Sequence, residues 1–391
     1  MAPRSKQPLE ERQLGRWRLI REFNHHLDHA LESWPLHPTW QSPQRQLALA
    51  DYLSLFLFGV FNPVVETMRG LILASHLPRV QEEVCRRSVS LGSFSEAQAV
   101  VDPALLKQVY DGLATEVAQR RPKGGQSANP YVEMMQIVDS TLWYALPRMH
   151  WAIWRTQYGT QRAFRLHVRF QLADNMPSDL TITPGRRCER LEWQAMAEPG
   201  DFYVGDRYYG EDYRLLANFK ETNCHFAVRL RSDAHWIVEE QLPIDQAASN
   251  ANVIWTGWVR LGKAGDGPRV RVVQIRTAKE VLSIATDLSP EQMSAELVSL
   301  CYRERWQVEL FFRWLKHIMK ANRWIAEGEE GVAIQIYLTL IAAQLFLLFT
   351  GDRPNRRALE LLQFMMIGWA TPEEVVALLK KQAAPRKKRT P

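Results

Sequence analysis

One stretch of this chain, VAIQIYLTLIAAQLFLLF at residues 332–349, limits what the chain can fold into more than any other. It is apolar on every side of a helix, so it needs either a lipid bilayer or enough protein to surround it. Gln335 and Gln344 interrupt the run, and polar amides are unfavourable in a membrane span. We therefore expect a buried core helix. With 391 residues, of which 46% are hydrophobic and 24% charged, the chain can build such a core.

Charge and cysteine content set weaker limits on function. Lys and Arg number 49 against 43 Asp and Glu, a net charge of +6 that permits a polyanionic partner without requiring one. The four cysteines contain no C-x-x-C pair, so neither a structural zinc site nor a disulfide framework has support. The first residues lack the apolar core of a signal peptide. These features favour a reducing, cytoplasmic compartment.

The hydrophobic pattern changes from helical to strand-like near residue 130. Residues 1–125 contain long helical apolar runs, and RPKGGQSANP at 121–130 has the composition of a linker. FRLHVRFQLA at 164–173 alternates strictly between apolar and polar residues, which predicts a half-buried strand. Further strand-like segments follow, and the chain ends with helices and a basic tail, PRKKRTP. This order predicts a mixed α/β domain with an all-helical front end.

The segment CYRERWQVELFFRWLKHIMK, residues 301–320, is predicted to be one amphipathic helix. At about 100° per residue, one narrow stripe carries a phenol, a carboxylate and two cations: Tyr302, Arg305, Glu309 and Lys316. The opposite face is apolar and can dock on a sheet; it carries Val308, Phe311, Leu315 and Ile318. Taken alone, the polar stripe is more typical of a solvated face with i, i+4 charge pairs, because charged helix faces are common.

Two aspartates elsewhere favour a catalytic role for this stripe. Asp139 lies inside the apolar segment IVDST, and Asp206 lies where a strand ends in YVGDRYYG. A buried acid is unfavourable unless something compensates for it, and a metal ion does so. Phosphodiester chemistry with two magnesium ions needs about three carboxylates that hold metals about 3.5–4 Å apart. Asp139, Asp206 and Glu309 are therefore candidate metal ligands and catalytic residues, with the Arg and Lys of the stripe as phosphate contacts.

Neighbouring residues are weaker candidates. Asp201 and Asp212 flank Asp206, but Asp206 alone sits at the strand end, where functional acids are common. Arg207 has two readings, since it either contacts DNA or balances the charge of Asp206. The scattered histidines do not form a metal-type pair.

The spacing of Tyr302, Arg305, Glu309 and Lys316 resembles the Tyr-x2-Arg-x3-Glu-x6-Lys signature of DDE transposases of bacterial insertion sequences. The surrounding YRERWQVELFFRWLK, which includes Trp306, also resembles this family. DST at 139–141 and GDRYYG at 205–210 resemble the blocks around the two catalytic aspartates, with Tyr208 where Gly is more usual. The resemblance covers roughly residues 130–350.

The resemblance implies an RNase H-like catalytic domain formed by residues 130–231 and 281–350, with a β-rich insertion at 232–280. The first acid would lie on the first strand, the second on the fourth strand, and Glu309 on the helix after the insertion. Asp206 and Glu309 are 103 positions apart, and a structureless loop of that length is improbable, so the interval itself indicates an inserted subdomain. Residues 1–125 would form a helical domain that binds DNA ends. Residues 351–391 would form C-terminal helices and a basic tail.

By this resemblance, we expect a DNA transposase that cleaves the ends of a mobile element and joins the 3′-OH ends to target DNA. Two Mg²⁺ ions, with Mn²⁺ as a substitute, would be held by Asp139, Asp206 and Glu309. The expected DNA contacts are Tyr302, Arg305, Lys316, Arg207 and Trp306.

The expected partners are double-stranded DNA, as terminal inverted repeats and as target, and a second copy of the chain in the DNA complex. The expected location is the bacterial cytoplasm, at the nucleoid when the protein is on DNA. Two alternatives stay open: an RNase H-like two-metal nuclease or resolvase without strand transfer, and a non-catalytic DNA-binding protein derived from a transposase.

Overall fold

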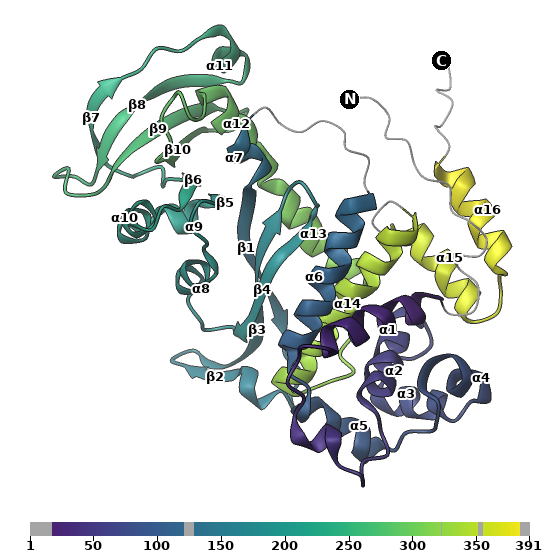
Figure 1. The fold of residues 1–391 in the computed structure, drawn as a ribbon. Helices are drawn as coiled ribbons and strands as arrows, with labels where there is room; N and C mark the ends of the chain where they lie inside the picture. Colours follow the sequence, from purple (N-terminus) through teal and green to yellow (C-terminus); the bar gives the residue numbers. More distant parts are fainter. Residues whose placement is uncertain (1–17, 121–128, 322, 351–354, 384–391) are drawn as a thin grey trace. The chain divides into compact units, whose positions relative to one another are not determined.

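The computed structural model describes residues 18–120, 129–321, 323–350 and 355–383, which divide into two compact units (Figure 1). The helical unit comprises residues 1–123, 148–151 and 314–391. The sheet unit comprises residues 124–147 and 152–313. The basic tail at 385–391 and most of the linker at 121–130 lie outside the described residues.

Helices from both ends of the chain form the helical unit. They are α1 (Arg18–Leu31), α2 (Leu49–Phe61), α3 (Met68–Ser75), α4 (Pro78–Val80), α5 (Leu91–Ala97), α6 (Pro103–Arg120), α14 (Glu329–Thr350), α15 (Arg356–Met366) and α16 (Pro372–Ala383). α14 contacts α1, α2 and α6, which surround its apolar sides. It is long and apolar enough to cross a membrane, but 94% of its most apolar 18-residue window is buried inside the protein. The structure thus shows the core helix expected at residues 332–349.

The buried amide of Gln335 in α14 is satisfied by residues of the preceding loop. The side-chain oxygen of Gln335 accepts a hydrogen bond from the amide of Ile325 at 2.9 Å. Its side-chain amide donates to the carbonyl of Arg323 at 2.5 Å. Buried polar groups are tolerated when hydrogen-bonded, so the interruption in the apolar run anchors the loop that precedes α14.

The compact units divide the chain differently from the four segments that the sequence suggests. Residues 314–350 group with the N-terminal helices, although the sequence places them in the catalytic domain. The C-terminal helices belong to the same unit. Helix packing between distant segments leaves no local pattern in a sequence, which is why the grouping was not expected.

Ten strands within the described residues form one mixed sheet (Figure 1). They are β1 (Met135–Tyr144), β2 (Ile153–Thr156), β3 (Gly159–Gln171), β4 (Met176–Pro184), β5 (Phe202–Gly205), β6 (His225–Arg229), β7 (Trp236–Gln241), β8 (Val253–Leu261), β9 (Arg269–Arg276) and β10 (Val281–Thr286). Their order is β2-β3-β1-β5-β6-β10-β9-β8-β7, with β4 on the other side of β3. β1, β5 and β6 are parallel, and the other pairs are antiparallel.

The β-rich segment at 232–280 extends this sheet. Its strands β7, β8 and β9 pair in sequence order, and β9 pairs with β10, which is next to β6. Hydrogen bonds between neighbouring strands therefore join the inserted strands to the central strands β1, β5 and β6. The inserted strands do not form a separate sheet.

Both faces of the central strands are covered. On one face, Trp193 of α8 (Glu189–Met196), Tyr209 of α9 (Arg207–Gly210) and Phe219 of α10 (Tyr213–Glu221) pack in a core with Val138. On the other, Phe311 of α13 (Trp306–His317) lies 5.3 Å, centroid to centroid, from the ring of Phe170 on β3. Short helices α7 (Pro130–Glu133) and α11 (Gln246–Asn250) lie at the ends of strands, and α12 (Ala295–Glu304) precedes α13.

The strand predicted to be half-buried is buried on both faces. His167 and Arg169, on its polar side, are only 2% and 7% exposed. β3 lies between β1 and β4, and each polar group has a partner: His167 bonds Thr183, and Arg169 bonds Ser178. Alternation predicted the strand correctly. The polar side chains on its other face, however, are buried beneath α8 and do not face solvent.

The segment predicted as one helix is divided at Arg305. α12 ends at Glu304 and α13 begins at Trp306. At the junction, the amide of Arg305 bonds the carbonyl of Tyr302, three residues back, at 3.2 Å. Arg305 keeps right-handed helical angles (φ −50°, ψ −31°), so the chain continues in helical sense through a tighter turn.

Candidate active site

Two adjacent parallel strands bring the two aspartates together. On β1 and β5, Ile137 is paired with Val204, and two further residues along each strand lead to Asp139 and Asp206. Asp206 directly follows β5 and is the N-cap of α9, where its Oδ1 accepts the amide of Tyr208 at 2.9 Å. Carboxyl ends of neighbouring parallel strands commonly form ligand sites in open α/β sheets.

Strand alternation sets the direction of Asp139. Ile137 is paired with Phe170, whose ring contacts Phe311 of α13. Asp139 lies two residues after Ile137, so its side chain points to the same face as α13. This is the face on which Glu309 lies.

Arg305 and Tyr302 link the helix acid to the strand acids. Nη2 of Arg305 donates to Oε1 of Glu309 at 2.7 Å. Burial raises the pKa of Tyr302, the positive charges of Arg305 and Arg229 lower it, and the negative charge of Asp206 raises it. Tyr302 is 8% exposed. The phenol and guanidinium of the signature therefore sit within electrostatic range of the aspartates.

Asp139 is the most perturbed acid of the site. Burial raises its pKa to about 7, against the hydrogen bond from the amide of Ser140. The negative charge of Asp206 contributes to this rise in pKa, and the positive charge of Arg305 opposes it. Burial that disfavours a carboxylate charge is the environment that a bound cation relieves.

The chemistry of the three acids fits a hard divalent cation. Within the described part of the chain, hydrogen bonds and ion pairs reach one oxygen each: Oδ1 of Asp139, Oδ1 of Asp206 and Oε1 of Glu309. The second oxygen of each carboxylate remains for a metal. An all-oxygen, carboxylate-rich set is what Mg²⁺ and Mn²⁺ prefer.

The three acids are not gathered as tightly as metal ligands. Among the described residues, the trio whose donor atoms all lie within 4.8 Å of one another is Glu22, His26 and Glu116. Glu309 instead pairs with Arg305. For all three acids to bind one metal site, the side chain of Glu309 would have to turn away from Arg305. A glutamate on a helix can do so by a change of rotamer.

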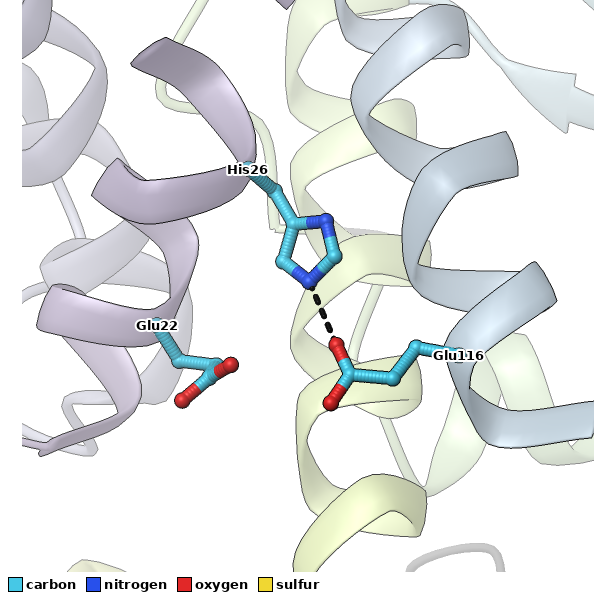
Figure 2. Close-up of side chains that lie close together, drawn as sticks. All are labelled: Glu22, His26 and Glu116. Atoms are coloured by element: carbon cyan, nitrogen blue, oxygen red, sulfur yellow. Dashed lines mark hydrogen bonds and ion pairs between the residues drawn. The ribbon is translucent and has the colours of Figure 1, made fainter. Parts of the chain in front are cut away.

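The trio in the helical unit is an interhelical contact (Figure 2). Glu22 and His26 lie on α1, and Nε2 of His26 meets Oε2 of Glu116 on α6 at 2.8 Å. The other oxygen of Glu116 is paired with Arg120. These two partners account for Glu116 without a metal.

The remaining expected DNA contacts occupy different environments. Arg207 follows Asp206 on α9 and is exposed. Trp306 is 47% exposed, with the guanidinium of Arg313 6.0 Å from its ring. Lys316 lies two turns after Glu309 on α13 and so on the same side of that helix, and burial lowers its pKa. Its position falls in the helical unit.

Three polar residues beside Asp139 were not predicted as part of the site. Ser140 Oγ donates to Oε2 of Glu189 on α8 at 2.5 Å and accepts from Nη1 of Arg165 on β3 at 2.7 Å. Arg165 also pairs with Oε1 of Glu189. Arg165 lies on the polar side of an alternating strand, which signals exposure and not function. Glu189 carries no local signal, because only the fold brings α8 to β1.

A family model matches the part of the chain that carries these residues. The model of the family described as Transposase DDE domain matches residues 131–345. Putative transposase y4zB of Sinorhizobium fredii is 25% identical over 277 residues, which cover 69% of this chain and 74% of that protein. The putative transposase for insertion sequence element IS4SA of Synechocystis is 22% identical over 333 residues, which cover 83% and 87%.

Shorter stretches match more closely. The transposase for insertion sequence element IS421 of Escherichia coli is 38% identical over 224 residues, which cover 47% of this chain and 60% of that protein. A solved structure of piggyBac transposase in a synaptic complex with hairpin DNA covers 99% of this chain and 86% of its own, at 10% identity and a TM-score of 0.41, which is too low to support an argument. Since the family model spans more than half of the chain, this protein belongs to the DDE transposases of insertion sequences.

Proposed function

We propose that this transposase cleaves the ends of its element and joins the freed 3′-OH ends to target DNA, with Asp139, Asp206 and Glu309 as metal ligands. The observation that carries the proposal is that the parallel pairing of β1 with β5 places Asp139 and Asp206 at neighbouring positions, and that α13 covers the sheet face of Asp139. Arg305 in turn holds Glu309. An acid inside β1, a second acid directly after the neighbouring parallel strand β5 and a third acid on α13 support a catalytic role for this group.

Two divalent ions, Mg²⁺ or Mn²⁺, would activate the attacking oxygen and stabilise the leaving oxygen when bound. Asp139 and Asp206 are fixed by the sheet, which pre-organises two ligands. Glu309, which pairs with Arg305 here, would be the third ligand. Arg305 would bind a phosphate of the DNA, since a guanidinium binds two oxygens at once.

We infer an RNase H-like core from the strand order. β4-β3-β1 are antiparallel, and β5 and β6 follow in parallel on the other side of β1. With the hairpin strand β2 set aside, the first acid is on the first strand, the second follows the fourth, and the third is on a helix after an insertion. This is the order that the family resemblance implies.

Several residues around the acids are proposed to contact DNA. Tyr302 and Lys316 would position the terminal phosphates, and Arg207 and Trp306 would contact the strand beside the site. The partner is double-stranded DNA, as element ends and as target, and two copies of the chain would act on the two ends. Residues 1–125 are proposed to bind those ends, and the protein to work in the bacterial cytoplasm at the nucleoid.

An assay with a labelled element end and a supercoiled target plasmid tests the proposal. Asp139→Asn, Asp206→Asn and Glu309→Gln are expected to abolish Mg²⁺-dependent cleavage while DNA binding stays measurable. Glu304→Gln is the matched control, because Glu304 is an acid of the adjoining helix α12 whose side chain accepts a hydrogen bond from Gln307. If Glu309→Gln cleaves at the wild-type rate, Glu309 is not a catalytic residue.

The same assay separates the alternatives. Cleavage of ends without joining to the plasmid identifies a two-metal nuclease or resolvase. Binding without cleavage in Mg²⁺ or Mn²⁺ identifies a DNA-binding protein that has lost catalysis.

A further inference from the structure

Asp139 is backed by three polar side chains from three elements. Ser140 follows it on β1, Arg165 is on β3, and Glu189 is in the first turn of α8. The hydroxyl of Ser140 accepts from Arg165 at 2.7 Å and donates to Glu189 at 2.5 Å. Arg165 closes the network by pairing with Glu189. Every member therefore contacts the other two.

This network lies on the opposite face of the sheet from Asp139. Ser140 is paired with His167 and Leu142 with Arg165, so Ser140 and Arg165 share a face. Asp139 points the other way, towards α13. Ser140 joins the two faces, because its amide donates to Oδ1 of Asp139 at 2.7 Å while its hydroxyl is in the network.

The network is expected to add little to the free energy of unfolding. The side chains of Arg165 and Glu189 are 18% and 19% exposed, so both ions lose most of their hydration. Nε of Arg165 is buried without a hydrogen-bond partner among the described residues. Ion pairs of this kind add little net stability, whereas removing one partner leaves an uncompensated charge. What such a pair does provide is a fixed geometry.

We propose that Glu189 and Arg165 are positioning residues that hold Ser140, and through its amide the carboxylate of Asp139, in the orientation that binds metal. The inference rests on the proposed function of Asp139. The backbone at Ser140 is restrained by β3 on one side and by α8 on the face opposite to Asp139. Loss of that restraint lets the Asp139 carboxylate adopt orientations that do not suit a metal. Groups that orient metal ligands typically change metal affinity or activity by about 10–100-fold.

Metal binding by the full-length protein tests this role directly. Free Mn²⁺ is measured by electron paramagnetic resonance during titration, and cleavage of the labelled element end is measured against Mg²⁺ concentration. Glu189→Gln and Ser140→Ala are expected to raise the Kd for Mn²⁺ and the half-saturating Mg²⁺ concentration by about tenfold or more. Binding of the DNA end in metal-free buffer is expected to stay unchanged. Ser140→Thr, which keeps a hydroxyl, is expected to restore metal binding.

A matched control comes from the same helix. Glu192 of α8 pairs with Arg187, and its side chain is also largely buried. Glu192→Gln removes an ion pair of the same helix whose partner, Arg187, is on neither β1 nor β3, and is expected to leave metal binding unchanged. If Glu189→Gln unfolds, the Mn²⁺ affinities of Ser140→Ala and Ser140→Thr test the positioning role instead.

Two results overturn the inference. One is wild-type Mn²⁺ affinity and Mg²⁺ dependence in Ser140→Ala. The other is an equal loss of metal affinity in Glu192→Gln, which indicates a general effect of α8 stability. Normal cleavage by Asp139→Asn is a separate failure, because it removes the proposed function itself.

Discussion

At the scale of single residues, Arg305 acts on three other side chains of the site. It bonds Glu309, and its positive charge lowers the pKa of Asp139 and of Tyr302. It also occupies the tight turn between α12 and α13, so its guanidinium is directed from a constrained backbone position. One side chain therefore connects a helix acid, a strand acid and a phenol.

Replacement of Arg305 by Lys is expected to reduce cleavage strongly with little loss of stability. Lysine keeps the charge but lacks the planar fork that holds a carboxylate or a phosphate through two hydrogen bonds. Single-turnover cleavage and urea unfolding measure the two effects. Arg313→Lys, on the exposed side of α13, is the control. Equal loss of activity in both variants contradicts a specific role for Arg305.

His167 makes stability depend on pH. Burial and, to a smaller extent, the nearby positive charges of Arg165 and Arg187 lower its pKa to about 4 from the usual 6.5. The unfolded chain therefore binds a proton that the folded chain does not, and the free energy of unfolding falls as pH drops from about 6.5 to 4. The loss is on the order of 1–3 kcal/mol.

Urea unfolding of wild type and His167→Gln at several pH values measures this contribution. The difference in free energy of unfolding between the two proteins is expected to change between pH 6.5 and 4 and to be constant above pH 7. A constant difference over the whole range contradicts a neutral, buried His167.

At the scale of elements, the site depends on how closely α9 approaches the sheet. α9 starts at its N-cap Asp206, and Gly210 at its end lies against the backbone of β6. A Cβ added at Gly210 would lie 2.1 Å from the carbonyl oxygen of Arg229. The absence of a side chain there lets α9 hold Asp206 against the sheet edge.

Gly210→Ala is expected to lower the free energy of unfolding by ~1–3 kcal/mol, because a backbone atom cannot move as a flexible side chain does. Gly92→Ala in α5 is the control, since nothing lies within 4 Å of its added Cβ. That change is expected to be neutral or to stabilise by ~0.5–1 kcal/mol, as alanine is the better helix former. Equal effects of the two substitutions contradict the close approach at Gly210.

At the scale of the whole molecule, the modest net charge of +6 implies that DNA affinity comes from a local group of cations. Each phosphate contact releases counterions, so the dependence of binding on salt reports the number of contacts. Lys316 lies on the same side of α13 as Glu309. Burial lowers its pKa. Its position falls in the helical unit.

Lys316→Ala is expected to reduce the slope of log K against log salt concentration by about 0.9, the value for one phosphate contact on duplex DNA. Fluorescence anisotropy of a labelled element end over a range of salt concentrations measures it. Lys107→Ala is the control, because Lys107 is paired with Asp111 on α6. An unchanged slope for Lys316→Ala removes Lys316 from the DNA contacts.

The sequence alone determined the features that local chemistry sets. The apolar run at 332–349 required a buried helix, strict alternation required the strand at 164–173, and the order of elements required a mixed α/β fold. The signature spacing at Tyr302 to Lys316 and the sequence blocks around Asp139 and Asp206 indicated the family. The roles of Asp139, Asp206 and Glu309 stay predictions. Each of these features is readable because side-chain periodicity and residue type act within a few positions along the chain.

The tertiary structure decided which distant segments meet. It joined the N-terminal and C-terminal helices in one unit, made the inserted strands extend the central sheet, and divided the signature helix at Arg305. It also placed Glu189 of α8 and Arg165 of β3 around Ser140. Such pairings arise from burial and hydrogen bonding between elements far apart in the chain. The sequence around one partner does not indicate which distant residue it will contact, so only the packed fold specifies these contacts.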